Sequence, residues 1–119
     1  MAERYEDPQV GIDAKKLIAH TLKVTANTDN FPKKYRFTIV NNMTNLCFEI
    51  YENIVDANNA RGEKRFQYIT RAISNCRKFR GYLEITLEVL HPKCSINYWA
   101  KMVNGIETQL LNWRRATKV

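Results

Sequence analysis

The side chains of this chain with the clearest chemical potential are its cations. Lys33, Lys34 and Arg36 fall within four positions of the segment Phe31-Pro-Lys-Lys-Tyr-Arg-Phe37. Lysine and arginine bind phosphate, and an arginine fork holds it with two hydrogen bonds. Pro32 suits the first turn of a helix, where cations meet the unfavourable end of the helix dipole. This placement indicates an anionic partner, and the alternative is a corner that is simply soluble.

Two further cationic clusters follow. One contains Lys64, Arg65, Arg71, Arg77, Lys78 and Arg80, and the other contains Arg114 and Arg115 after Trp113. The chain has 19 Lys and Arg against 12 Asp and Glu, a net charge of +7, which suits nucleic acid or another acidic partner. We predict that these two clusters form a continuous basic surface, although solvated helix faces explain the charge equally well. No aromatic platform with flanking cations is evident, so we expect weak sequence preference.

Motifs for enzymatic chemistry are absent from the sequence. There is no glycine-rich phosphate loop, no zinc-protease helix motif and no nucleophile elbow. A dimetal bundle needs paired Glu-x-x-His motifs, and Glu88-Val-Leu-His91 stands alone. Cys47, Cys76 and Cys94 form no CxxC pair, so we expect reduced thiols, with the first two buried. The sequence predicts a cytoplasmic protein that is not an enzyme and has no metal, cofactor or membrane segment.

The elements that position the cations are predicted to be helices, because apolar residues recur at gaps of three and four. No hairpin signal is present. We expect residues 1–11 to form a loose arm and residues 12–119 to form one domain. Its helices are predicted at about 13–27, 32–57, 63–90 and 95–116, with Asp13 capping the first helix and Ser95 capping the fourth. The inward positions are predicted to be Leu17, Ile18, Leu22, Thr25, Phe37, Val40, Met43, Cys47, Ile50, Ile54, Ala57, Phe66, Ile69, Ile73, Cys76, Phe79, Leu83, Leu87, Leu90, Trp99, Val103, Ile106, Leu110 and Trp113.

Four apolar stripes joined by short turns specify an all-α fold, an antiparallel up-and-down four-helix bundle. The two longest predicted helices would each extend about 40 Å, which leaves part of that pair uncovered by the shorter first helix. Apolar residues outside the stripes, such as Phe48, Tyr51 and Tyr82, add to this surface. An uncovered apolar surface favours association, so we predict a homo-oligomer.

Three segments resemble one known family of four-helix bundles. The segment from Asp29 to Thr38 resembles its FPK-x-x-RF signature. The segment from Leu46 to Asn58 resembles its second helix, which ends in Ala-Asn. The segment from Tyr98 to Arg114 resembles its last helix, which ends in a tryptophan followed by basic residues. The chain departs from the family where glycines are common, after Thr38 and before Trp113.

The family has two branches. One comprises accessory variability determinants (Avd proteins) of diversity-generating retroelements, which the segments favour, and the other comprises proteins encoded in intervening sequences of bacterial large ribosomal RNA. The resemblance implies a non-catalytic subunit of a ring-like homopentamer. It would bind the retroelement's reverse transcriptase and template RNA through the clusters above, and DNA is a further candidate partner. Its role would be to support mutagenic cDNA synthesis and retrohoming. The alternatives are an intervening-sequence protein with a structural or unknown role and a bundle enzyme or cofactor carrier.

Overall fold

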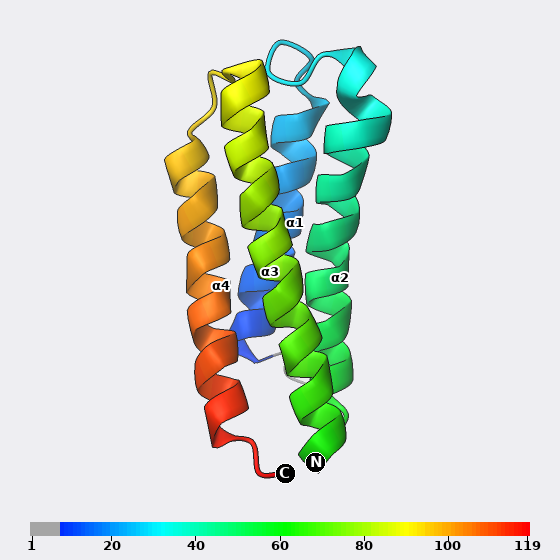
Figure 1. Cartoon of the computed structure of the whole chain (residues 1–119), viewed down its shortest axis with the longest axis vertical. Helices are drawn as coiled ribbons and strands as arrows, with labels where there is room; N and C mark the ends of the chain where they lie inside the picture. Colours follow the sequence, from blue (N-terminus) through cyan, green and yellow to red (C-terminus); the bar gives the residue numbers. More distant parts are fainter. Residues whose placement is uncertain (1–7) are drawn as a thin grey trace.

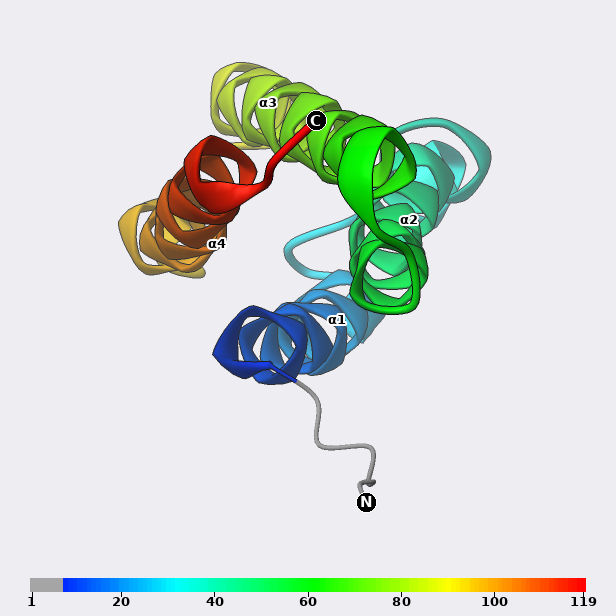
Figure 2. The same cartoon turned by 90° about the horizontal axis from the view of Figure 1, so that it is seen from below.

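The computed structural model describes residues 8–119, which form an all-helical, elongated molecule (Figure 1). The helices run alternately up and down, and α1, α2, α3 and α4 follow one another around the bundle axis in the end view (Figure 2). No strand occurs in this part of the chain, so the all-α prediction is confirmed. The four α-helices are α1 (Gln9–Ala26), α2 (Asn41–Asn58), α3 (Gly62–Leu90) and α4 (Ile96–Ala116).

The core lies along the bundle axis, and Trp99, near the start of α4, is its largest fully buried side chain. Its indole meets the rings of Phe31 and Phe79 edge-on, at centroid distances of 6.0 and 5.9 Å. The indole Nε1 donates a hydrogen bond of 3.1 Å to the hydroxyl of Thr21, so the buried N–H is satisfied. Of the predicted core positions, the buried ones are Leu17, Met43, Cys47, Ile50, Ile54, Ala57, Ile69, Ile73, Cys76, Phe79, Leu83, Trp99, Val103, Ile106 and Leu110.

The first helix begins earlier than predicted. α1 starts at Gln9 after Pro8, and Asp13 is not its cap but lies one turn inside it. The part of the predicted arm within residues 1–7 lies outside the described residues. The buried residues of α1 are Val10, Gly11, Ala14, Leu17 and Thr21. The buried side of the helix therefore passes through Thr21, and Leu22, which was predicted to face inward, is 45% exposed.

The second predicted helix is divided into three pieces. A 3₁₀ turn (Lys33–Tyr35) and a π-helical turn (Arg36–Val40) precede α2. The wider π turn shifts the register of the side chains, so Ile39 is buried and Phe37 is 81% exposed. The predicted inward position of Phe37 is wrong, whereas Phe31 anchors this corner in the core.

The third and fourth helices follow their sequence signals closely. α3 ends before Pro92, with His91 in the left-handed conformation at φ 46°. Ser95 caps α4 as predicted, because its hydroxyl accepts a 3.1 Å hydrogen bond from the N–H of Tyr98. Near the end of α3 the predicted stripe is wrong by one residue. Thr86 is buried and donates its hydroxyl to a carbonyl one turn earlier, and Leu87 is 52% exposed.

The remaining predicted core positions lie at the margin of the core. They are only partly buried, and most of them pack against the buried cluster. These positions are Ile18, Thr25, Val40, Phe66, Leu90 and Trp113.

Candidate nucleic-acid interface

The predicted cations do not form one continuous surface. Lys33, Lys34 and Arg36 lie where α1 turns into α2, at the upper end of the bundle in Figure 1. Arg114 and Arg115 lie at the opposite end, beside the start of α3. The molecule is 46 Å long in this direction, so the corner is separated from the terminal cluster by most of its length. The corner residues, which were not part of the predicted continuous surface, therefore form a separate cationic group.

On the side of α3 that faces α4, two of the predicted contact residues bind an acidic side chain of the same molecule. Arg77 Nε donates to Glu107 Oε2 at 3.1 Å, and Arg80 Nη1 donates to Glu107 Oε1. Arg80 also donates to the amide oxygen of Asn104 at 3.1 Å. Burial alone would raise the pKa of Glu107, but the hydrogen bonds from the two arginines hold it below its ordinary value. These arginines thus join α3 to α4.

Arg65 also has a structural position. Its Nε donates to the carbonyl of Ala57 at 2.9 Å, and its Nη2 donates to the carbonyl of Asn58 at 3.5 Å. These carbonyls lie in the last turn of α2, and that of Ala57 also accepts a hydrogen bond from the N–H of Ala60 at 3.2 Å. The guanidinium also lies over the ring of Trp113 at 5.6 Å. Arg65 therefore closes α2 and packs against α4.

The two terminal arginines contact their surroundings differently. Arg114 lies over Phe66 at 5.7 Å and donates to the hydroxyl of Thr70 at 3.3 Å, both on α3. Arg115 is exposed and donates to Asn112 on its own helix at 3.0 Å. Arg114 therefore has a cross-helix structural contact, and Arg115 projects into solvent.

The side of α3 that faces α2 is different, because its cations have no acidic partner. The Nζ of Lys64 and the Cζ of Arg71 lie 5.9 and 5.3 Å from the centre of the Tyr68 ring. Lys78 and Tyr82 line a hollow with residues of α2 further along. No ion pair within residues 8–119 engages these cations. The expectation that no aromatic platform with flanking cations exists is therefore wrong.

Lys33 and Arg36 line a separate hollow between α1 and α2, together with the hydroxyl-bearing Thr25 and Thr44. Lys34 lies 5.2 Å from the centre of the Tyr35 ring. All three corner cations are exposed, and none forms an ion pair in the described part of the chain. The corner therefore keeps the anion-contacting capacity that the sequence indicated.

Arg61, a cation outside the predicted clusters, also reaches the terminal end. Arg61 and Lys118 line an open hollow with Arg65 and Trp113. Gly62 adopts φ +59°, a left-handed conformation that favours glycine, and a Cβ there would lie 3.8 Å from the carbonyl of Lys118. This turn brings the start of α3 beside the end of the chain. Only the position of Arg61 beside the turn glycine signals this in the sequence.

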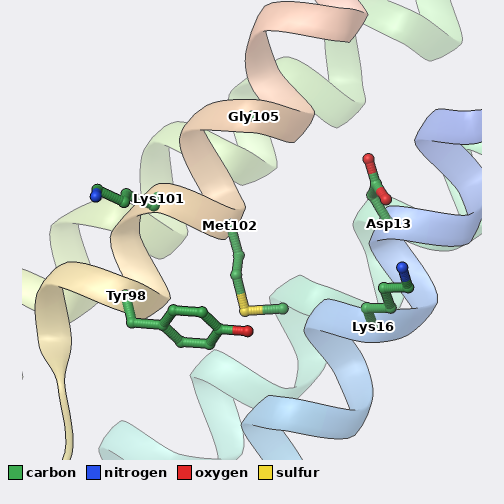
Figure 3. Close-up of a pocket in the computed structure, with 6 residues that line it drawn as sticks. All are labelled: Asp13, Lys16, Tyr98, Lys101, Met102 and Gly105. Carbon is green, nitrogen blue, oxygen red and sulfur yellow. The ribbon is translucent and has the colours of Figure 1, made fainter.

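The groove between α1 and α4 has a mixed set of polar side chains (Figure 3). The carboxylate of Asp13 accepts hydrogen bonds from Gln9 at 2.9 Å and Gln109 at 2.7 Å. Lys16 and Tyr98 line the same hollow. Asp13 is thus already held by two side-chain amides.

Candidate nucleophiles and metal ligands are not brought together either. Burial raises the pKa of the Cys47 thiol to about 11 and that of the Cys76 thiol to about 12, so neither is a thiolate near neutral pH. His20 meets the rings of Tyr98 and Trp99 edge-on, and burial, followed by the charge of Lys23, lowers its pKa. Among the described residues, no group of three or more potential His, Cys, Asp or Glu ligands is placed to hold a metal ion.

No protein-family model matches this chain, and neither a curated protein nor a solved structure matches it. Within residues 8–119, every helix is too short or too polar to cross a bilayer. The described molecule is an all-helical protein, and its exposed cations without an ion pair within residues 8–119 include those at the corner before α2 and along the α2-facing side of α3.

Proposed function

We propose that this chain is a non-catalytic accessory protein of a diversity-generating retroelement. It binds the template RNA and the reverse transcriptase through basic surfaces and supports mutagenic cDNA synthesis and retrohoming. The observation that most directly supports it is a set of exposed cations on one side of α3 that form no ion pair within residues 8–119, namely Lys64, Arg71 and Lys78. The resemblance in residues 29–38, 46–58 and 98–114 supplies the identity of the partners.

Phosphate binding by such cations follows from electrostatics. Each contact releases counterions from the RNA, so the affinity falls as salt rises, with a log–log slope of about −0.7 per phosphate on single strands. Contacts of this kind position the RNA and read little of its sequence. The chain thus contributes binding and orientation, and the chemistry of DNA synthesis belongs to the reverse transcriptase.

We further propose that the chain acts as a homo-oligomer, with five subunits as the number that the resemblance implies. Exposed apolar side chains support this, since Ile85, Leu87 and Val89 at the end of α3 are 46%, 52% and 48% exposed. Phe48 on α2 is 39% exposed, whereas Tyr51 and Tyr82 are half-buried. Closed assembly would bring several weak RNA contacts together. Light scattering that reports a monomer across the working concentration range would contradict this part of the proposal.

The test of the function uses the purified chain with its reverse transcriptase and template RNA. We expect the chain to bind both partners and to be required for cDNA synthesis on that template. A reverse-transcriptase gene beside paired template and variable repeats in the source genome is the matching genetic expectation. Failure to bind either partner, or a gene inside ribosomal RNA, would instead support the intervening-sequence alternative.

A further inference from the structure

We propose that the α2-facing side of α3 binds an unpaired RNA strand, with Tyr68 and Tyr82 stacking on bases and the cations beside them contacting phosphates. This inference rests on the proposed function, because it names the form of RNA and the residues that hold it. We call this surface the tyrosine–cation stripe, and it comprises Lys64, Tyr68, Arg71, Asn75, Lys78 and Tyr82.

The six residues form one continuous row along α3. Successive members are four, three, four, three and four positions apart, the spacing that keeps side chains on one side of a helix. The row from Lys64 to Tyr82 extends about 27 Å at 1.5 Å per residue, which is long enough for several nucleotides. Two hollows shared with α2 lie along it, one at Lys64 and Tyr68 and the other at Lys78 and Tyr82.

The chemistry of the stripe fits a flexible strand with accessible bases. Each tyrosine is half-buried, and both rings pack against the core cluster, which fixes the ring while part of it remains exposed. Lys64 and Arg71 lie over the ring of Tyr68, so a base that stacks on this ring would displace a cation from the ring face toward the neighbouring phosphate. Aromatic rings alternating with cations are the arrangement that proteins use for single-stranded nucleic acid.

Asn75 adds a specific feature in the middle of the stripe. It is only 6% exposed, and its Nδ2 has no hydrogen-bond partner in the described structure. Buried donors are nearly always paired, so an orphaned amide is unusual. Arg71 and Lys78 lie one turn before and one turn after it. The atom has less than 1 Å² of accessible surface, so pairing it with an RNA oxygen would require the side chains that cover it to move aside.

The surroundings define the limits of the stripe. Glu49 and Asp56 line the α2 side of the two hollows, so phosphates are favoured on the α3 side. Beyond Tyr82 the row continues with Ile85 and Val89, which have no side-chain donor, and the RNA-binding surface therefore ends there. A paired duplex keeps its base faces stacked internally and cannot present them to the tyrosines.

The test measures binding of a fluorescein-labelled, mixed-sequence single-stranded RNA and of the same RNA annealed to its complement. We expect the wild type to prefer the single strand. Tyr68→Leu and Tyr82→Leu should each weaken that binding at least about fivefold, which corresponds to the loss of one base stack. Tyr68→Phe keeps the ring and should bind like the wild type. Tyr98→Leu is the matched control, because Tyr98 is 56% exposed but lies on α4.

A second measurement on the unmodified protein guards against misfolding of the leucine variants. RNA containing 4-thiouridine, crosslinked by light, should attach to peptides within residues 64–82. Equal affinity for single strand and duplex, unchanged binding by folded tyrosine variants, or crosslinks confined to residues 33–36 and 114–118 would each overturn the inference. In these cases RNA still binds and the proposed function stands, whereas a wild type that binds no RNA would contradict the proposed function itself.

Discussion

The two sides of α3 contain the same kinds of cation but use them differently. Arg77 and Lys78 are adjacent in sequence, yet Arg77 pairs with Glu107 of α4 while Lys78 lines a hollow beside α2. The α4-facing side joins helices together, and the α2-facing side leaves its charges to solvent. The comparison teaches that a count of cations overestimates a binding surface, because the neighbouring helix determines which charges remain unpaired.

The solvent exposure of the paired side chains limits how much the salt bridges contribute to the free energy of unfolding. The side chain of Arg77 is 58% exposed, whereas those of Arg80 and Glu107 are 33% and 12% exposed. Exposed pairs contribute at most about 1 kcal/mol because water screens them. We therefore assign most of the structural contribution on this side of α3 to Arg80, which also bonds Asn104.

The largest expected effect comes from removing the packing beneath both sides of α3. Ile54 is 1% exposed on α2, and Ile54→Ala should lower the free energy of unfolding by roughly 2–5 kcal/mol through lost burial and a cavity. Urea denaturation measures it. Phe48→Ala on the same helix is the control, because Phe48 is 39% exposed and should change stability much less. If Ile54→Ala lowers the free energy of unfolding by only a few tenths of a kcal/mol, Ile54 is not in the core and the register of α2 differs from the one described.

The most direct test of the comparison removes two charges from each side in turn. Arg71→Gln with Lys78→Gln should weaken single-stranded RNA binding about tenfold and flatten the salt slope by about 1.4, which is two phosphate contacts. Arg77→Gln with Arg80→Gln removes the same charge from the α4-facing side and should weaken binding much less. Fluorescence anisotropy at two salt concentrations measures both. Equal losses would show that net charge alone drives binding.

The reverse contrast is expected for stability. Arg80→Gln removes the shorter of the two bridges to Glu107 and should cost about 1 kcal/mol. Lys78→Gln should leave the free energy of unfolding nearly unchanged, because Lys78 has no bonded partner among the described residues. Thermal unfolding followed by circular dichroism compares the two. If Lys78→Gln destabilises the chain more than Arg80→Gln, the assignment of roles to the two sides is reversed.

The smallest effect concerns pH. The pKa of Glu107 is lower in the folded chain than its ordinary value of 4.5, so its bridges stabilise the fold above that value. This contribution should disappear as the pH falls through the lowered pKa, where the carboxylate becomes protonated. The melting temperature of the wild type should therefore fall more steeply from about pH 6 to about pH 3 than that of Glu107→Gln. If the melting temperatures of the wild type and of Glu107→Gln fall in parallel with pH, the salt bridges of Glu107 do not stabilise the fold.

Much of the fold was predictable from sequence because the relevant signals are local. Gaps of three and four predicted α3 and α4 almost to the residue, and Ser95 caps α4 as its position before the helix indicated. The corner was less predictable, since a π turn requires one extra residue per turn and leaves no clear periodicity. A regular α-helix would place Phe37 on the buried side, but the π turn places it in solvent.

The candidate site was only half predictable. The sequence by itself determined that α3 has cations beside its apolar stripe, because helix geometry converts spacing into sides. Neighbouring residues point about 100° apart on a helix, so Arg77 and Lys78 had to face different surroundings. The surroundings of each side depend on which helices flank α3. Only tertiary packing places Glu107 beside Arg77 and places Lys78 at the hollow beside α2.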